Sequence, residues 1–232
     1  MNISKKCKNM LQYKQKSISF HYITLYCKKM KRQIFEKITE PFWVLHYQDL
    51  LLLTDMSPSY LSRQLFEWNK KWNLCKLRNG VYIHCKKIKN THQFLIANEI
   101  VSPSYISNES ALYYRSMIPE AVKVIISITS KKTQSYDTHV WNFYFHHIAR
   151  DMFDGYSVYD GIAIARPEKA ILDYLWYHKQ CLDEHLYTSL RLTLPDTFDT
   201  DLCKKYLSAW SNKRFVEDVN TYFLSLPQKT SW

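Results

Sequence analysis

A polar run that begins at Ser57 carries side chains able to hydrogen-bond to nucleic acid. Ser57-Pro58-Ser59-Tyr60 is followed by Leu61-Ser62-Arg63-Gln64, so hydroxyl, guanidinium and amide groups stand close together in the chain. An arginine can donate two hydrogen bonds to one guanine, a glutamine can pair with an adenine, and hydroxyl groups suit phosphates or base edges. A helix that placed this run in a groove of duplex DNA could bind and read the duplex.

The residues of this run predict such a helix. Ser57 is a suitable N-cap, because its hydroxyl can accept a hydrogen bond from an open backbone N–H group, and Pro58 fits the first helical position. Leu61, Leu65 and Trp68 recur at helical spacing and should face a core. Near the outward face this leaves Ser59, Tyr60, Ser62, Arg63 and Gln64, followed by Lys70 and Lys71. Together with Ser57, we expect these side chains to contact bases or phosphates.

The segments before this helix predict two shorter helices. Residues 31–39 read as a helix that Pro41 stops. An extended segment over 42–44 and a second helix over 46–53 follow. Thr54-Asp55-Met56 then makes the turn into the helix that begins after Ser57.

A hairpin is expected after these helices. Leu74–Arg78 and Val81–Ile83 read as strands, and Asn79-Gly80 between them predicts a type I′ turn. This order of parts is that of a winged helix-turn-helix, whose second helix of the pair enters the major groove. On the hairpin, or wing, Lys76, Arg78 and Asn79 could reach phosphates or the minor groove. A winged helix that binds another protein is the alternative.

Positive charge is concentrated in the half of the chain that carries these segments. Of the 232 residues, those up to 92 include 18 Lys/Arg and five Asp/Glu, whereas residues 93–232 include 14 and 16. A basic excess confined to one half indicates binding to a polyanion, either nucleic acid or an anionic membrane surface. No stretch approaches the roughly 20 apolar residues that a membrane-spanning helix needs, and we expect no membrane partner.

The charge and the periodicity also suggest how the chain is divided. Residues 1–29 contain seven lysines and no acidic residue. We expect this basic leader to be disordered or to lie upstream of a start at Met30, with a DNA-contacting arm as the alternative. A connector rich in Lys, Asn and His over 86–92 marks a boundary. The expected domains are a winged helix over 30–90 and a second domain over 91–232.

The second domain reads as mixed α/β with a helical tail, which gives an α+β fold class for the whole chain. Ser107 can cap a helix that runs through Met117, and Pro167 can open another. The other expected elements are a helix over 94–101, strands over 122–129, 140–148 and 157–165, and a mostly helical tail from 183.

The cysteines and acidic residues do not predict a metal site. Six cysteines show no CxxC spacing, although Cys75 and Cys85 flank the predicted hairpin and could come near each other. With no secretory signature, a reducing cytoplasm is the expected compartment. Asp151, Asp154 and Asp160 could suggest a metal-binding cluster, but they lie in a predicted loop, where acids commonly solvate a turn. We expect no metal, no cofactor and no catalytic residue.

Motifs in both halves together resemble one protein family. The segments that carry the resemblance are Pro103–Ser107, Glu109–Tyr114, Ile128–Thr133 and Ile164–Tyr174, with Arg78–Tyr82 on the hairpin. They are similar to the AbiEi family of antitoxins from type IV toxin–antitoxin systems. The resemblance covers about Met30 to Trp176, and the tail after Tyr177 matches only loosely.

That family consists of bacterial repressors whose N-terminal winged helix binds inverted repeats ahead of their own operon. Their C-terminal part counters a nucleotidyltransferase-like toxin without needing a stable complex. The resemblance implies double-stranded operator DNA and such a toxin as partners, and a palindromic operator would require two protomers. The alternatives are a stand-alone winged-helix regulator with a ligand- or protein-sensing second domain, and a metal-dependent enzyme acting on nucleic acid through Asp151, Asp154 and Asp160.

Overall fold

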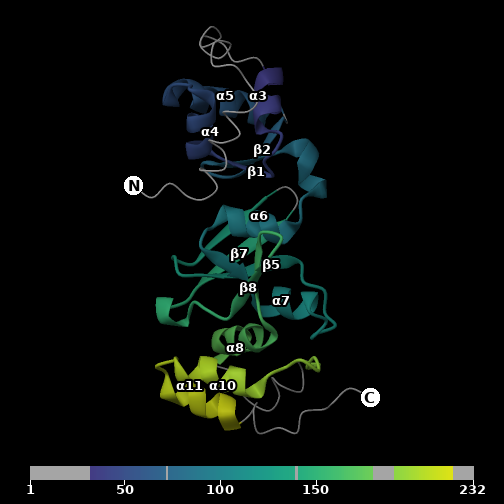
Figure 1. The fold of residues 1–232 in the computed structure, drawn as a ribbon, viewed down its shortest axis with the longest axis vertical. Helices are drawn as coiled ribbons and strands as arrows, with labels where there is room; N and C mark the ends of the chain where they lie inside the picture. The colour runs from purple at the N-terminus through teal and green to yellow at the C-terminus, as the bar shows by residue number, and fades with distance from the viewer. Residues whose placement is uncertain (1–31, 72, 139–140, 180–190, 222–232) are drawn as a thin grey trace. The chain divides into compact units, whose positions relative to one another are not determined.

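The protein is a mixed α/β chain with two sheets, one in each of two compact units (Figure 1). The structure is a computed structural model that describes residues 32–71, 73–138, 141–179 and 191–221. The first unit comprises Met1–Thr91 and the second comprises His92–Trp232. The expected leader over 1–29 and part of the expected helical tail lie outside the described residues.

The first unit combines helices with a three-stranded sheet of order β1-β3-β2. Both outer strands run antiparallel to β3. In chain order the elements are α3 (Arg32–Thr39), β1 (Val44–His46), α4 (Tyr47–Thr54), α5 (Pro58–Lys70), β2 (Leu74–Arg78), β3 (Val81–His84) and the 3₁₀ helix η1 (Cys85–Asn90).

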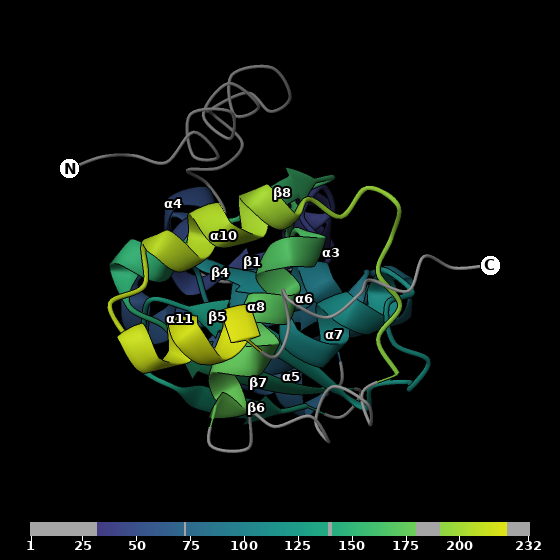
Figure 2. The ribbon, with the colours of Figure 1, turned by 90° about the horizontal axis from the view of Figure 1, so that it is seen from below.

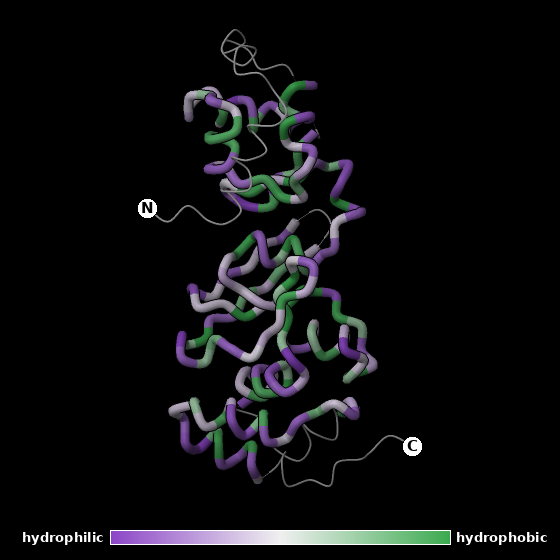
Figure 3. The backbone as a smooth tube through the Cα atoms, viewed as in Figure 1, coloured by the Kyte–Doolittle hydropathy of each residue, from purple (hydrophilic) through white to green (hydrophobic). Residues whose placement is uncertain are grey.

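Apolar side chains from the helices and strands of the first unit form its core. The predicted stripe on α5 is confirmed, because Leu61, Leu65 and Trp68 are buried there. Phe35 of α3 meets the Trp68 ring at a centroid distance of 4.1 Å. Each such side chain stabilises the fold by about 1.5–3 kcal/mol when fully buried. Figure 3 shows the helices of this unit alternating between hydrophobic and hydrophilic residues, whereas η1 is mostly hydrophilic.

The turn between α4 and α5 fixes where α5 begins. Asp55 ends α4 in a left-handed conformation with φ 51°. Ser57 is the N-cap, as predicted, and its hydroxyl accepts a hydrogen bond from the Tyr60 N–H at 3.4 Å. Pro58 occupies the first helical position. The first turn of α5 therefore starts with its polar residues next to the turn.

The β2–β3 hairpin differs from the predicted type I′ turn. That turn needs positive φ at both central residues, but only Gly80 has one, at 77°, and Asn79 does not. Instead, the pairing of β2 with β3 shifts by one residue between Lys76 and Arg78, which is a β-bulge. This bulge bends the hairpin where a type I′ turn would otherwise have done so. The Tyr47 N–H donates to the Gly80 carbonyl at 2.8 Å and ties the turn to the start of α4.

A buried histidine joins the end of β3 to α3. The Thr39 hydroxyl donates to the Phe35 carbonyl at 2.8 Å, and the His84 Nε2 lies 2.7 Å from the same hydroxyl oxygen. Because the hydroxyl proton is already used, His84 must be the donor of this second hydrogen bond. Burial, with the charges of Lys87 and Lys86 as further causes, lowers the pKa of His84 from 6.5 to about 4.

Acidification is expected to destabilise the first unit through His84. The unfolded chain takes up a proton near pH 6.5 and the folded chain only near pH 4, so stability present at pH 7 is lost as the pH falls through that window. Between pH 7 and pH 5 the loss is about 1–2 kcal/mol. Urea unfolding at both pH values measures it. His84→Gln should remove this part of the pH dependence, and an unchanged dependence would contradict the assignment.

The second unit is built on a six-stranded mixed sheet of order β6-β7-β5-β4-β9-β8. The β5–β7 and β4–β9 pairs are parallel and the others antiparallel. The strands are β4 (Ser104–Ile106), β5 (Val124–Thr129), β6 (Gln134–Asp137), β7 (Asn142–His147), β8 (Tyr156–Tyr159) and β9 (Ile162–Ala165).

Helices cover this sheet on two sides. In Figure 1 the sheet lies between α6 and a group that contains α8, α10 and α11, and Figure 2 shows that group in front of the sheet. The helices are α6 (Gln93–Ile100), α7 (Asn108–Tyr114), η2 (Arg150–Met152), α8 (Pro167–Tyr177), α10 (Thr200–Ser208) and α11 (Lys213–Val219).

The strand expected over 157–165 is in fact the β8–β9 hairpin. Asp160 and Gly161 have φ values of 49° and 81°, so the type I′ combination of two positive angles occurs here. An Asp-Gly pair is the sequence signal that corresponds to this turn. The strands β4 and β6 were also not expected, because runs of three and four residues show too little periodicity.

A buried polar cluster joins α8 to the sheet of the second unit. The Lys169 Nζ lies 2.5 Å from the Asp173 Oδ1, and both side chains are fully buried. The other carboxylate oxygen accepts hydrogen bonds from the Tyr105 hydroxyl at 3.0 Å and the Ser107 hydroxyl at 2.7 Å. Burial, then the Asp173 charge, raises the pKa of Tyr105 well above its usual value. Ser107 occupies the N-cap position of α7, but the prediction that its side chain caps the helix is wrong, because its hydroxyl donates to Asp173 instead.

Candidate nucleic-acid interface

The structure brings three of the predicted contact residues together at a surface hollow of the first unit. Ser62 of α5 and Arg78 and Asn79 of the hairpin line this hollow, whose volume is about 460 Å³. The other lining residues are His46, Tyr47, Gln48, Gly80 and Tyr82. The start of α4, the first turns of α5 and the tip of the hairpin therefore share one surface.

Tyr47 fixes the geometry of this surface, and sequence reasoning missed it. Its hydroxyl donates to the Pro58 carbonyl at 2.9 Å and lies 3.1 Å from the Ser62 hydroxyl. Ser62 donates to the same carbonyl at 2.8 Å. The Ser62 proton is thus used inside the protein, so Ser62 can offer DNA only a lone pair. The one sequence signal for Tyr47 is its place at the start of the helix before α5.

The remaining predicted residues at the start of α5 differ in what they expose. Ser57, Ser59 and Arg63 are exposed and Gln64 is partly exposed. Arg63 makes no hydrogen bond or ion pair with another described residue, and its side chain is exposed. The Tyr60 hydroxyl is buried and likewise has no partner in the described part of the chain. In this conformation the Tyr60 hydroxyl does not reach the surface, and a contact between Tyr60 and DNA stays a prediction.

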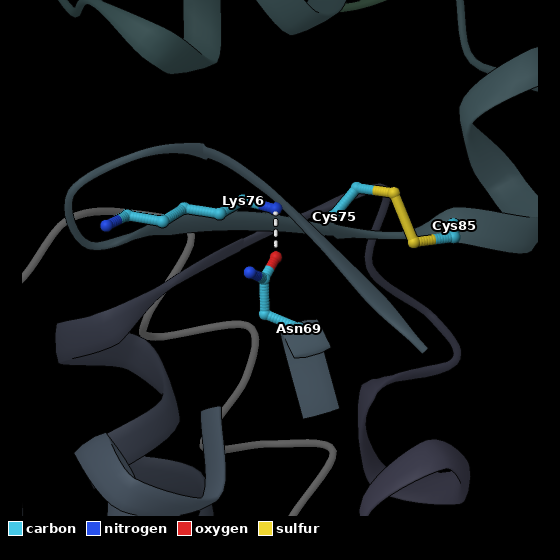
Figure 4. The surroundings of a disulfide bond; sticks show 4 residues. All are labelled: Asn69, Cys75, Lys76 and Cys85. Atoms are coloured by element: carbon cyan, nitrogen blue, oxygen red, sulfur yellow. Dashed lines mark hydrogen bonds between the residues drawn. A yellow bond between two sulfur atoms is a disulfide. The ribbon is translucent and has the colours of Figure 1, made fainter. Parts of the chain in front are cut away.

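The basic residues expected to extend the site lie at the other end of α5. Lys70 and Lys71 are exposed at its last turn, and Lys76 is exposed on β2. A rise of about 1.5 Å per residue puts Lys70 roughly 16 Å along the helix from Ser59. The Asn69 Oδ1 accepts the Lys76 backbone N–H at 3.0 Å and ties this end of α5 to β2 (Figure 4). The predicted site therefore divides into two groups.

More lysines lie on η1, in the segment that sequence reasoning had treated as a connector. Lys86 and Lys89 are exposed. Lys87 instead donates to the carbonyls of Glu40 and Phe42 and lies 5.6 Å from the centre of the Trp43 ring. Lys87 therefore anchors η1 to the α3–β1 connection, while its two neighbours add positive charge to the surface.

Cys75 and Cys85 form a disulfide that joins β2 to the start of η1 (Figure 4). Their Cα atoms are 5.2 Å apart. The sequence suggested that they could come near each other, but a reducing compartment gave no reason to expect a bond. The free cysteine in the described part of the chain is Cys203, which is buried on α10.

Asp151, Asp154 and Asp160, which could suggest a metal-binding cluster, do not form such a group among the described residues. Asp151 lies in η2, Asp160 lies in the β8–β9 turn, and partial burial raises the pKa of Asp154 between them. Within the described ranges, no group of three or more His, Cys, Asp or Glu side chains is placed to hold a metal ion. Nor does any helix in those ranges combine the length and apolarity needed to cross a membrane.

Four of the five segments that carry the family resemblance, all except Arg78–Tyr82, lie in the second unit. Ile106 of β4 pairs with Ile164 of β9. Tyr105 and Ser107 from the first of these segments bind Asp173 from the last. The Ser110 hydroxyl accepts the Ile126 N–H at 2.8 Å and joins α7 to β5. These residues hold the second unit together.

Comparisons with protein-family models and with curated proteins give no match for this chain.

Proposed function

We propose that the first unit is a winged helix-turn-helix that binds duplex DNA. The observation that carries the proposal is the shared surface at the hollow, where the start of α5 lies beside the tip of the hairpin. The element order α3-β1-α4-α5-β2-β3 and the sheet order β1-β3-β2 support it. A winged helix-turn-helix has this order of parts, and its second helix and its hairpin contact the same duplex. In this assignment α5 is the recognition helix and the β2–β3 hairpin is the wing.

The two groups of predicted residues would then have different roles. Arg63, with Ser59 and Gln64 nearby, would contact base edges in the major groove. Lys70, Lys71 and Lys76 would neutralise phosphates and release bound counterions, which makes affinity fall with added salt. Arg78 and Asn79 at the tip of the wing would contact the backbone or the minor groove.

We further propose that the protein is a repressor of its own operon and an antitoxin of the AbiEi type. The motif segments from Pro103 to Tyr174 support this proposal. The protein would act in the cytoplasm by binding rather than by catalysis, as two protomers on inverted repeats. Its functional partner would be a nucleotidyltransferase-like toxin, which the second unit counters without a stable complex.

One observation favours the alternative of a regulator whose second unit senses a ligand. A surface hollow of about 540 Å³ is lined by residues of the α7 region and the segment after Arg191. Two exposed rings, Tyr113 and Tyr114, stand at its edge. These rings could stack on a small planar ligand that binds beside Arg191. A toxin gene next to the operator would favour the antitoxin function over the ligand-sensing regulator.

Arg63→Ala is expected to weaken binding to the upstream DNA of the operon about 5- to 150-fold, because one bidentate base contact contributes roughly 1–3 kcal/mol. Fluorescence anisotropy with that duplex and with a scrambled duplex, at several salt concentrations, measures it. The substitution should lower the affinity for the scrambled duplex much less.

Arg214→Ala is the matched control, because Arg214 is an exposed arginine of α11 in the second unit. Its affinity for both duplexes should be that of the wild type. A wild-type protein that binds neither duplex contradicts the proposed function. An Arg63 variant that keeps the full preference for the upstream duplex contradicts only the role given to Arg63.

A further inference from the structure

The Cys75–Cys85 disulfide closes a loop that contains the whole tip of the wing. The two cysteines are ten residues apart in sequence. Three of the predicted DNA contacts, Lys76, Arg78 and Asn79, lie between them. Cys75 lies on β2 opposite Ile83, and Cys85 follows the last residue of β3. The bond therefore sits at the open end of the hairpin, away from its tip.

The strand that this bond fastens is one of the two outer strands of its sheet. β2 is an edge strand, since β3 separates it from β1. The Lys76 N–H of this strand also donates a hydrogen bond to Asn69 of α5. The disulfide is thus a second fastening, one residue away from the first, for the strand that carries Lys76 and Arg78.

The surroundings of this pair favour thiol chemistry. Both cysteines are partly exposed, and each is followed directly by an exposed lysine, Lys76 or Lys86. Figure 4 shows the Lys76 side chain directed away from the disulfide, so the exposure of the pair, rather than a neighbouring charge, lets a small thiol or disulfide reach it. Cys203 shows the opposite case, because burial, then the charges of Glu168 and Asp199, raises the pKa of its thiol to about 12.

We propose that Cys75 and Cys85 form a thiol–disulfide switch that exchanges with small disulfides of the glutathione class and sets the affinity of the wing for DNA. In the oxidising direction, one cysteine thiolate attacks the small disulfide, forms a mixed disulfide and releases one small thiol. The second cysteine thiolate then attacks the protein sulfur and releases the other. The protein loses two electrons and two protons, and the small disulfide becomes two thiols.

This proposal rests on the proposed DNA-binding function and adds its regulation. With the bond closed, the edge strand is held in place before DNA arrives, so less conformational freedom is lost on binding. With the bond open, β2 keeps its pairing with β3 but loses the second fastening. The oxidised form is therefore the one that binds more tightly.

The test uses the full chain with Cys7, Cys27 and Cys181 replaced by serine, so that Cys75 and Cys85 are the reactive pair. The protein is equilibrated with mixtures of reduced and oxidised glutathione, and one portion is alkylated and weighed by mass spectrometry to give the oxidised fraction. The other portion is titrated onto a fluorescent duplex of the upstream DNA. The matched control carries Cys75→Ser and Cys85→Ser in addition. Far-UV circular dichroism follows the fold of each form.

The oxidised fraction should rise with the glutathione disulfide content, and the reduced form should bind the duplex about three- to tenfold more weakly with its dichroism unchanged. The serine control should bind like the reduced form in every mixture. A pair that does not respond to the mixtures overturns the switch, as do equal affinities of the two forms. Unfolding on reduction also overturns it, because the bond would then only hold the fold together. If neither form binds DNA, the proposed function fails and this proposal with it.

Discussion

Asp173→Ala is expected to lower the free energy of unfolding of the second unit by about 3–5 kcal/mol, the usual effect of breaking a buried ion pair. The substitution leaves the Lys169 ammonium fully buried without its counter-charge. It also removes the acceptor for the Tyr105 and Ser107 hydroxyls. Urea unfolding followed by tryptophan fluorescence measures the change.

Two controls separate the buried charge from other effects of this substitution. Asp201→Ala removes an aspartate that is 92% exposed and lies 3.4 Å from Lys204, so no measurable change is expected. Combining Asp173→Leu with Lys169→Met should recover part of the lost stability, because no unpaired charge remains. If the double variant were no more stable than Asp173→Ala, the uncompensated charge would not be the cause.

Gly155→Ala is expected to destabilise the second unit by about 2–4 kcal/mol, which combines the usual costs of a left-handed non-glycine residue and of overpacking. Gly155 has a φ of 71°, and a Cβ atom there would lie 2.9 Å from both the Cβ and the Cγ of Lys169. The alanine would press on the buried stem of Lys169, so the Lys169–Asp173 contact would shift as well.

Gly161→Ala is the matched control for this prediction. Gly161 also has a positive φ, at 81°, but a Cβ atom there would meet only the Leu95 Cδ1 at 3.5 Å, an ordinary contact. Its cost should be the backbone effect alone, about 1–2 kcal/mol. Thermal unfolding of both variants compares them. Equal losses in the two variants would mean that the close approach to Lys169 has no energetic effect.

The sequence was sufficient for the parts of the fold that depend on local pattern. Leu61, Leu65 and Trp68 recur at the helical period and are buried, and Ser57 with Pro58 has the chemistry of a helix start. Such signals need only a few neighbouring residues, because capping and amphipathicity are properties of a single helix.

Features that depend on distant partners could not be found in this way. The strand β4 has three residues and exists because it pairs with residues 127–129 on one side and with Ile164 on the other. The Asn79-Gly80 pair predicted a type I′ turn, but the bulge in β2 gives the hairpin a different turn. The type I′ combination of angles appeared instead at Asp160-Gly161.

The candidate site shows the same division. The exposure of Ser59 and Arg63 could be predicted from the helical pattern, because both residues lie outside the apolar stripe of α5. The roles of Tyr47 and Tyr60 could not, since each depends on how α4 and α5 pack. The Cys75–Cys85 bond depends on strand register, which brings two residues ten positions apart within reach.

The central position of β4 has a consequence for how the protein is made. β4 comes first among the six strands of its sheet, yet it lies between β5 and β9. During synthesis β5 can cover one edge of β4 early, but the other edge stays open until residues 162–165 have left the ribosome. The Asp173 carboxylate that binds Tyr105 and Ser107 arrives later still. Open strand edges invite wrong pairing, and pairing across long separations is slow. We therefore expect the second unit to stay open to wrong pairing until β9 and α8 have been synthesised, whereas the three strands of the first unit lie within residues 44–84 and can pair earlier.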